Sequence, residues 1–203
     1  MKTIILANGE FPKAEKTLQI LKSADRIICC DGAANNLIVY GLEPNIIIGD
    51  MDSLADDIKQ KYKDRIVTLK EQNTNDLTKA VNWGIANNIS KFYILGATGK
   101  REDHSIANIA LLSEYSKIAD VQIISDYGVF KSINKSTKFE SFIGQQISIF
   151  AMDYNTIIKS DGLKYPLNNM NLKNWWNGTL NEATSNSFSV SFEQGTLIVY
   201  QLF

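Results

Sequence analysis

The first 125 residues alternate short apolar runs with longer helix-like segments. Six runs are rich in apolar and β-branched residues and are expected to form strands: residues 3–7, 26–30, 46–48, 65–69, 92–95 and 121–125. Helices are expected between them at residues 12–22, with Pro12 in the first turn, and at 33–40, 56–63, 76–86 and 104–117. Strands that are almost continuously apolar and alternate with helices predict an α/β fold, a doubly wound and mostly parallel six-stranded sheet with helices on both faces.

The pattern changes after Asp126. Helix signals fade, and apolar and polar residues alternate with a period of two in runs such as 146–150 and 187–192, while residues 196–202 supply a last strand. Glycines interrupt this region at intervals that suit hairpins and sandwich connections. We therefore expect two domains, an α/β domain at residues 1–127 and a smaller antiparallel β-sandwich at residues 128–203.

Composition narrows the classes of function. With 203 residues and 44% apolar content, the chain can bury at least one sizeable core. A formal net charge of −1 gives no long-range field that favours nucleic acid or an anionic membrane. The longest apolar runs are too short to span a bilayer and no signal peptide is evident, so we expect a cytoplasmic protein. Cys29 and Cys30 are adjacent on a predicted strand and point to opposite faces, so two free thiols are expected. His104 is the sole histidine and there is no spaced cysteine pair, which argues against a zinc site.

Acidic residues follow the predicted strands of the first domain. Asp50 and Asp52 come directly after the third strand, Asp31 follows the second, and Asp76 opens a helix. The carboxyl ends of parallel strands meet at one edge of a sheet, so these carboxylates are predicted to share a divalent cation there. Taken singly each signal is weak, because solvated acidic turns are common and Asp76 also offsets the dipole of its helix.

Basic and small residues in the same domain suit phosphate. Lys79 lies one helical turn after Asp76, where it either addresses a phosphate or forms a simple i,i+3 ion pair. The loop of residues 96–104 contains two glycines and Thr98, but it has neither Walker A nor dinucleotide-binding spacing. Arg101 is the natural bidentate clamp, Asp103 can orient it or approach a metal, and His104 caps or packs at the helix start more readily than it acts as a base.

Aromatic residues mark the second domain. Tyr165, Trp175 and Trp176 lie in a loop-rich region together with the polar run 184–186. Adjacent tryptophans on a strand cannot both point inward, so one of Trp175 and Trp176 is expected at an interface or against a ligand. An aromatic face suits a cationic heteroaromatic ligand.

These motifs, taken in order, resemble the thiamine pyrophosphokinase family over nearly the whole chain. The matching segments are residues 31–34, 49–53, 75–80, 96–104 with 107–108, 162–167 and 184–186. The resemblance implies Mg²⁺-dependent transfer of the pyrophosphoryl group of ATP to thiamine, giving thiamine diphosphate and AMP. It also implies an N-terminal catalytic domain, a C-terminal β-sandwich that binds thiamine, and a homodimer with active sites at the subunit junction.

The resemblance assigns roles by position. Metal ligation falls to Asp50, Asp52 and Asp76, and catalysis to these three with Lys79 and Arg101. ATP binding is implied for Asp31, Lys79, Thr98, Arg101, Asp103 and His104. Thiamine binding is implied for Tyr165, Thr184, Ser185 and Asn186.

Three departures from the family pattern stand out. Asn75 replaces the more usual Thr or Ser, Lys100 replaces the second glycine of Gly-Gly-Arg, and Tyr165 stands where tryptophan is frequent. The aromatic that stacks on thiamine therefore stays open among Tyr165, Trp175 and Trp176, and the general base stays open among Asp50, Asp52, Asp76 and Asp103.

Two other functions compete with this assignment. Asp50-Met51-Asp52 superficially mimics the nucleophile and acid of an aspartyl-phosphate phosphatase. A non-catalytic nucleotide-binding regulator would carry the same carboxylates only as a solvated rim.

Overall fold

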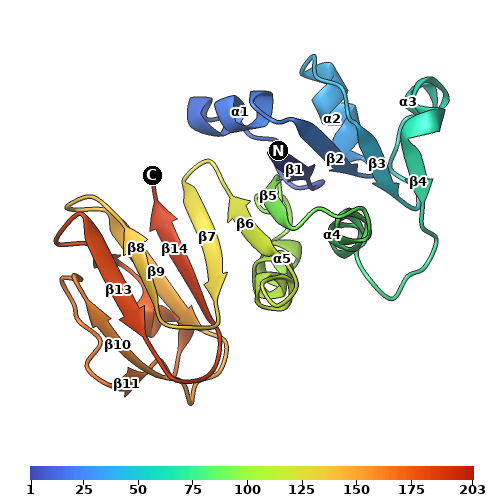
Figure 1. Ribbon diagram of the computed structural model, residues 1–203. Coiled ribbons are helices and arrows are strands. Elements are labelled where there is room, and N and C mark those ends of the chain that lie inside the picture. Colours follow the sequence, from blue (N-terminus) through green and yellow to red (C-terminus); the bar gives the residue numbers. More distant parts are fainter. The chain divides into compact units, whose positions relative to one another are not determined.

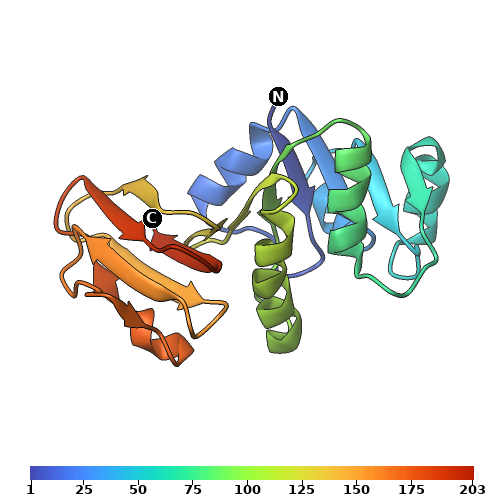
Figure 2. The same ribbon diagram turned by 60° about the horizontal axis from the view of Figure 1, so that its bottom comes forward.

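The computed structural model describes all 203 residues, which form two compact units (Figures 1 and 2). The N-terminal unit contains Met1–Ile109 and Ile118–Asp126, and the C-terminal unit contains Ala110–Lys117 and Tyr127–Phe203. Among the helices, none combines the length and the apolar character that a membrane span requires.

The N-terminal unit is the predicted α/β fold. Its parallel strands lie in the order β6-β5-β1-β2-β3-β4. They are β1 (Thr3–Leu6), β2 (Arg26–Cys30), β3 (Ile46–Gly49), β4 (Ile66–Thr68), β5 (Lys91–Leu95) and β6 (Asp120–Ile124). The helical segments are α1 (Glu15–Lys22), α2 (Ala33–Val39), α3 (Asp56–Lys61), η1 (Lys63–Arg65), α4 (Asp76–Ala86) and α5 (Glu102–Tyr115), of which the last part of α5, from Ala110, belongs to the C-terminal unit.

The strand order explains where a ligand can bind. The chain proceeds outward from β1 to β4 and then returns through α4 to β5, which pairs with the other side of β1. Because such crossovers are right-handed, the helices after the return lie on the opposite face, and Figures 1 and 2 show α4 and α5 on the other side of the sheet from α1 and α2. The reversal at β1 and β5 creates a topological switch point, where α/β sheets bind ligands at the carboxyl ends of the strands.

The first helix begins later than predicted. It starts at Glu15 rather than near Pro12, and its N-cap residue, Ala14, has no capping side chain. Asp126, just after β6, takes the role of a cap: its carboxylate accepts hydrogen bonds from the backbone N–H of Lys13, at 2.9 Å, and from the hydroxyl of Thr17. A distant residue thus fixes the start of this helix.

The C-terminal unit contains two antiparallel sheets and matches the predicted β-sandwich. One sheet has the order β12-β9-β14-β7 and the other β11-β10-β13-β8. The first sheet contains β7 (Gly128–Ile133), β9 (Gln146–Ala151), β12 (Asn181–Glu182) and β14 (Leu197–Leu202). The second contains β8 (Thr137–Glu140), β10 (Ile157–Asp161), β11 (Met170–Asn171) and β13 (Ser187–Ser191), and a short helix, η2 (Trp175–Gly178), follows β11.

Alternating side chains from both sheets form the core of this unit. Ile147, Ile149 and Leu197 of the first sheet belong to the same buried cluster as Ile158 and Phe188 of the second. This is the arrangement that the period-two pattern predicts, since only every other residue of a sandwich strand faces inward.

Candidate active site

A cleft of about 470 Å³ opens in the N-terminal unit at the carboxyl ends of the strands. Residues that follow β1, β2, β3 and β5 line it, as do the first turns of α4 and α5. The predicted residues that line it are Asp31, Asp50, Asp52, Asp76, Lys79, Thr98, Arg101 and His104. The edge of the sheet therefore gathers carboxylates and cations from segments far apart in the sequence.

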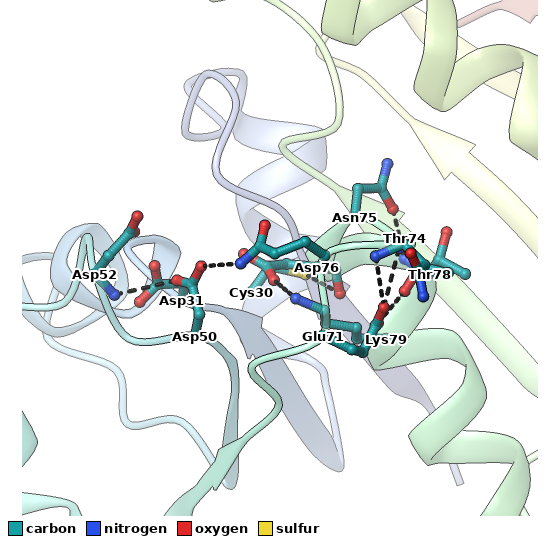
Figure 3. A network of polar contacts seen from close by, with 12 residues as sticks. Cys30, Asp31, Asp50, Asp52, Glu71, Thr74, Asn75, Asp76, Thr78 and Lys79 are labelled. Carbon is teal, nitrogen blue, oxygen red and sulfur yellow. Dashed lines mark hydrogen bonds and ion pairs between the residues drawn. The ribbon is translucent and has the colours of Figure 1, made fainter.

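Three aspartates form the centre of negative charge. One carboxylate oxygen from each of Asp31, Asp50 and Asp52 lies within 4.8 Å of the others, a spacing that can hold a metal ion (Figure 3). Asp31 is 3% exposed and accepts a hydrogen bond from the backbone N–H of Ser53 at 3.0 Å, but its Oδ1 is buried without any partner. The cluster thus includes a buried oxygen with free acceptor capacity.

The environment of Asp31 favours its neutral form. Burial raises its pKa, the hydrogen bond from Ser53 lowers it, and the neighbouring carboxylates of Asp52 and Asp76 raise it again, so that the pKa lies at about 6. Nearby Asp50 behaves in the opposite way, because hydrogen bonds from the side chain of Gln72 and from the backbone of Asp52 lower its pKa. A cation at the cluster would favour the ionised form of all three carboxylates.

Backbone conformation brings these loops close together. Asp31 and Met51 adopt left-handed backbone conformations with φ of 39° and 70°, which residues other than glycine rarely adopt. Gly49 has φ of 157°, and a Cβ at this position would lie 2.8 Å from Cβ of Asp31 and 3.2 Å from Cγ of Asp76. Only glycine allows the end of β3 to approach both carboxylates so closely.

Helix α4 presents Asp76 and Lys79 from its first turn. Asn75 caps the helix by accepting a hydrogen bond from the backbone N–H of Thr78 at 2.9 Å. Lys79 is 5% exposed, and its Nζ lies 3.1 Å from Oδ1 of Asp76. The simple i,i+3 ion pair is therefore present, and it faces the cleft (Figure 3). Asp76 lies beside the three-aspartate cluster but outside the set that meets its 4.8 Å spacing.

The loop after β5 contains Thr98 and Arg101, and the first turn of α5 contains Asp103 and His104; all of these except Asp103 line the cleft. Nε of Arg101 donates to Oδ1 of Asp103 at 3.1 Å, and Nη2 donates to the other carboxylate oxygen. This fork lowers the pKa of Asp103 to about 2 and raises that of Arg101. Asp103 thus orients the guanidinium, while His104 is exposed and its backbone N–H donates to Asp103. Helix α5 begins at Glu102, two residues before the predicted start.

Several lining residues were not assigned a role from the sequence. Gln72 donates to Oδ2 of Asp50 at 3.1 Å, and Asn108 on α5 donates to the backbone carbonyl of Ala97 at 2.8 Å. Asn8 and Lys100 face each other across the ends of β1 and β5. Of these residues, only Asn108 and Lys100 lie in segments that resemble the family. Asn8 directly follows a predicted strand, and this position is the one sequence feature that indicates a place at the edge of the sheet.

A second cavity of about 470 Å³ lies in the C-terminal unit. Thr184 and Ser185 line it, together with Lys138 and Asp161, whereas Tyr165 and Asn186 do not. Tyr165 is exposed and the ammonium of Lys164 lies 6.0 Å from the centre of its ring.

The two adjacent tryptophans do not lie on a strand, so the premise of strand geometry was wrong, whereas the expected contact of one of them with an interface or a ligand stays a prediction. They form the start of η2, and the exposed fractions of Trp175 and Trp176 are 51% and 71%. Trp175 contacts Phe150 edge to face, with ring centres 6.2 Å apart. A short helix directs both rings outward.

Comparison with known proteins places both units in one family. Residues 17–124 match the family described as thiamin pyrophosphokinase, catalytic domain, and residues 128–200 match thiamin pyrophosphokinase, substrate-binding domain. Thiamine pyrophosphokinase from Bacillus subtilis is 28% identical over 188 residues, which is 83% of each chain. Thiamine pyrophosphokinase 1 from rice is 30% identical over 128 residues, and that match spans 51% of this chain and about half, 48%, of the rice protein.

Solved structures agree with these matches. The crystal structure of thiamine pyrophosphokinase from Bacillus subtilis superposes with a TM-score of 0.82 at 25% identity, covering 99% of both chains. The thiamin pyrophosphokinase structure from Geobacillus thermodenitrificans shares the fold, with a TM-score of 0.83 at 22% identity over 100% of this chain and 98% of that one. The chain belongs to the thiamin pyrophosphokinase family, with a catalytic and a substrate-binding region of that family in order along its sequence.

Proposed function

We propose that this chain transfers the pyrophosphoryl group of ATP to the hydroxyl of thiamine, giving thiamine diphosphate and AMP, and that the cleft of the N-terminal unit binds the nucleotide. The observation that carries this proposal is the cluster of Asp31, Asp50 and Asp52, which lies within the region that matches the catalytic domain. Lys79 and Arg101 line the same cleft and provide the positive charge that a triphosphate needs.

The donor set of the cleft fits Mg²⁺. All the candidate ligands are carboxylate oxygens, which hard divalent cations prefer, and the buried Oδ1 of Asp31 has no hydrogen-bond partner in the protein. We assign metal binding to Asp50, Asp52 and Asp76, with Asp31 as a further ligand. When bound there, Mg²⁺ supplies positive charge to the phosphate oxygens and holds the triphosphate in place.

The side chains of the chain itself bind and orient the reactants. The thiamine hydroxyl oxygen forms a bond to the β-phosphorus, and the bond from this phosphorus to the oxygen that bridges it to the α-phosphorus breaks, so that AMP leaves with the electron pair. Lys79 and Arg101, the latter held by Asp103, stabilise negative charge on the phosphate oxygens. The hydroxyl proton passes to solvent or to a carboxylate among Asp50, Asp52, Asp76 and Asp103. Thr98 and His104 complete the lining around the nucleotide.

Thiamine is assigned to the C-terminal unit, within which we propose residues 128–203 as the thiamine-binding domain. Thr184 and Ser185 line its cavity, and Asn186 follows them in the same turn. The exposed rings of Tyr165, Trp175 and Trp176 are the candidates for stacking on the pyrimidine. We further propose a homodimer with each active site at the subunit junction, as the resemblance to the family implies. We also propose a cytoplasmic location, as expected from apolar runs too short to span a bilayer.

The decisive assay measures AMP and thiamine diphosphate formed from ATP and thiamine, with and without Mg²⁺. We expect both products in equal amounts, and a loss of both without the metal. Asp52→Asn should lower turnover by orders of magnitude. Asp57→Asn is the matched control, because Asp57 is an exposed aspartate on α3 outside the cleft.

The same assay separates the competing functions. A phosphatase would release inorganic phosphate from phosphomonoesters and form no thiamine diphosphate. A regulator would bind nucleotide without turnover and would tolerate Asp52→Asn. Either result would refute the proposed transfer reaction.

A further inference from the structure

The three lysine and arginine side chains of the cleft differ in how their charge is balanced. Lys79 forms an ion pair with Asp76, and Arg101 forms one with Asp103. Lys100 forms none: its Nζ donates to the backbone carbonyl of Asn8 at 3.0 Å and to the side-chain carbonyl of Asn8 at 3.2 Å. Lys100 is therefore the cation of the cleft whose charge no carboxylate of the chain neutralises.

The backbone holds this ammonium in place without a ligand. The loop after β1 and the loop after β5 are joined by hydrogen bonds from Gly9 N–H to Gly96 O, at 2.7 Å, and from Glu10 N–H to Thr98 O, at 2.8 Å. The loops approach so closely that a Cβ on Gly9 would lie 2.3 Å from Gly96 O. Asn8 and Lys100 extend from these joined loops, so their contact is fixed at the ends of β1 and β5, the switch point of the sheet.

The position of Lys100 gives the cleft two ends of opposite charge. The carboxylates of Asp31, Asp50 and Asp52 follow β2 and β3, whereas Lys100 lies over the end of β1 next to β5. One divalent cation on the carboxylates neutralises only part of the charge of a triphosphate, and the remainder favours a cation at the other end.

We propose that Lys100 is a phosphate-binding residue of this enzyme that contacts the triphosphate of ATP, an inference that rests on the proposed function. Lys100 is exposed to solvent and lines the cleft, so a ligand can reach it. Asn8 is the positioning residue of Lys100, because its two carbonyl oxygens accept hydrogen bonds from the ammonium. An ammonium has three N–H donors, so one N–H stays available for a phosphate oxygen.

Binding of adenosine 5′-(α,β-methylene)triphosphate with Mg²⁺, measured by calorimetry, tests the proposal without turnover, because the methylene bridge cannot be cleaved. Lys100→Gln should weaken binding about tenfold, which corresponds to the loss of one charge-assisted hydrogen bond of about 1.4 kcal/mol. Lys100→Arg should retain most of the affinity, and raising the salt concentration should narrow the difference between wild type and Lys100→Gln. Lys63→Gln is the control, because Lys63 is exposed on η1 and outside the cleft.

Steady-state kinetics supplies the second readout. Lys100→Gln should raise the KM for ATP and leave the KM for thiamine and the melting temperature unchanged. An affinity of Lys100→Gln for the analogue within twofold of wild type would overturn the inference. An equal rise in both KM values together with a lower melting temperature would also overturn it, because that result indicates a purely structural role. If the wild type forms thiamine diphosphate but Lys100→Gln has no effect, this inference alone fails. If the wild type does not bind the analogue, the proposed function fails as well.

Discussion

Replacing Gly49 with alanine tests whether the spacing of the carboxylates determines the rate. Gly49 ends β3 immediately before Asp50, and its φ of 157° is a conformation that L side chains rarely adopt. The added methyl group would lie 2.8 Å from Cβ of Asp31 and 3.2 Å from Cγ and Oδ2 of Asp76. The substitution therefore acts on two carboxylates at once without removing either.

The contact distances give the size of the effect. Carbon atoms in contact are ordinarily about 3.5–4.0 Å apart, so Asp31 must move away by about 1 Å. A misplacement of this size in a catalytic site costs on the order of 100-fold in rate, which is about 2.7 kcal/mol in the activation barrier. The backbone conformation adds about 1–3 kcal/mol of strain to the folded state.

Comparing Gly49→Ala with Gly41→Ala separates crowding from strain. Gly41 has φ of 90°, and a Cβ there meets nothing within 4 Å. Both variants should lose stability in equilibrium urea unfolding, but only Gly49→Ala should lose about two orders of magnitude in kcat for AMP formation. Wild-type kcat in a folded Gly49→Ala variant would refute the reasoning that carboxylate spacing limits the rate.

Three other side chains give tests with different readouts. Asp126→Ala should lower the free energy of unfolding by about 1 kcal/mol, as the loss of a helix cap does. Burial raises the pKa of Asp126, but hydrogen bonds from Thr17 and from the backbone before α1 bring this pKa below its ordinary value. The extra stability of the wild type is therefore full above about pH 3.9 and disappears as the pH falls through the lowered native pKa. Parallel urea-unfolding stabilities for the two proteins down to acid pH would contradict this. Arg101→Lys keeps the charge but loses the fork on Asp103, so turnover should fall roughly tenfold, and unchanged kinetics would remove Arg101 from the phosphate site. Ser185→Ala should raise the KM for thiamine roughly tenfold at an unchanged KM for ATP, whereas an equal rise in both would contradict its assignment to thiamine.

The sheet could be predicted because its strands carry their own signal. Runs such as residues 3–7 and 26–30 are apolar on both faces, and this pattern suits only strands covered by helices on both sides. The start of α1 could not be predicted, because the capping carboxylate of Asp126 lies 113 residues from Lys13 in the sequence. Local signals near Pro12 contain no information about a partner so distant.

The carboxylates that line the cleft could be predicted from the same sheet topology, but the contacts between the side chains of the cleft could not. Parallel strands bring Asp31, Asp50 and Asp52 to one edge whatever the loops do. The contact of Gln72 with Asp50 and the contact of Lys100 with Asn8 depend on how one loop lies against another. No sequence period describes such contacts, and for that reason the role of Lys100 emerges only from the structure.

Two aspartates at the strand ends of this sheet show how structural carboxylates differ from those arranged for a ligand. Asp126, after β6, uses both oxygens as acceptors within the protein, and its pKa is lowered. Asp31, after β2, is buried with one oxygen unpartnered, adopts φ of 39°, and has its pKa raised to about 6. An unpartnered buried acceptor costs about 1–3 kcal/mol and a left-handed residue costs a similar amount, so the fold alone gives no reason to keep this arrangement. Binding of a cation would offset these costs, because a ligand that binds only the folded state stabilises it, and does so more the higher its affinity. Both residues therefore lie at the same edge of the sheet, and the unpartnered oxygen is the feature that leaves Asp31, unlike Asp126, able to accept a ligand.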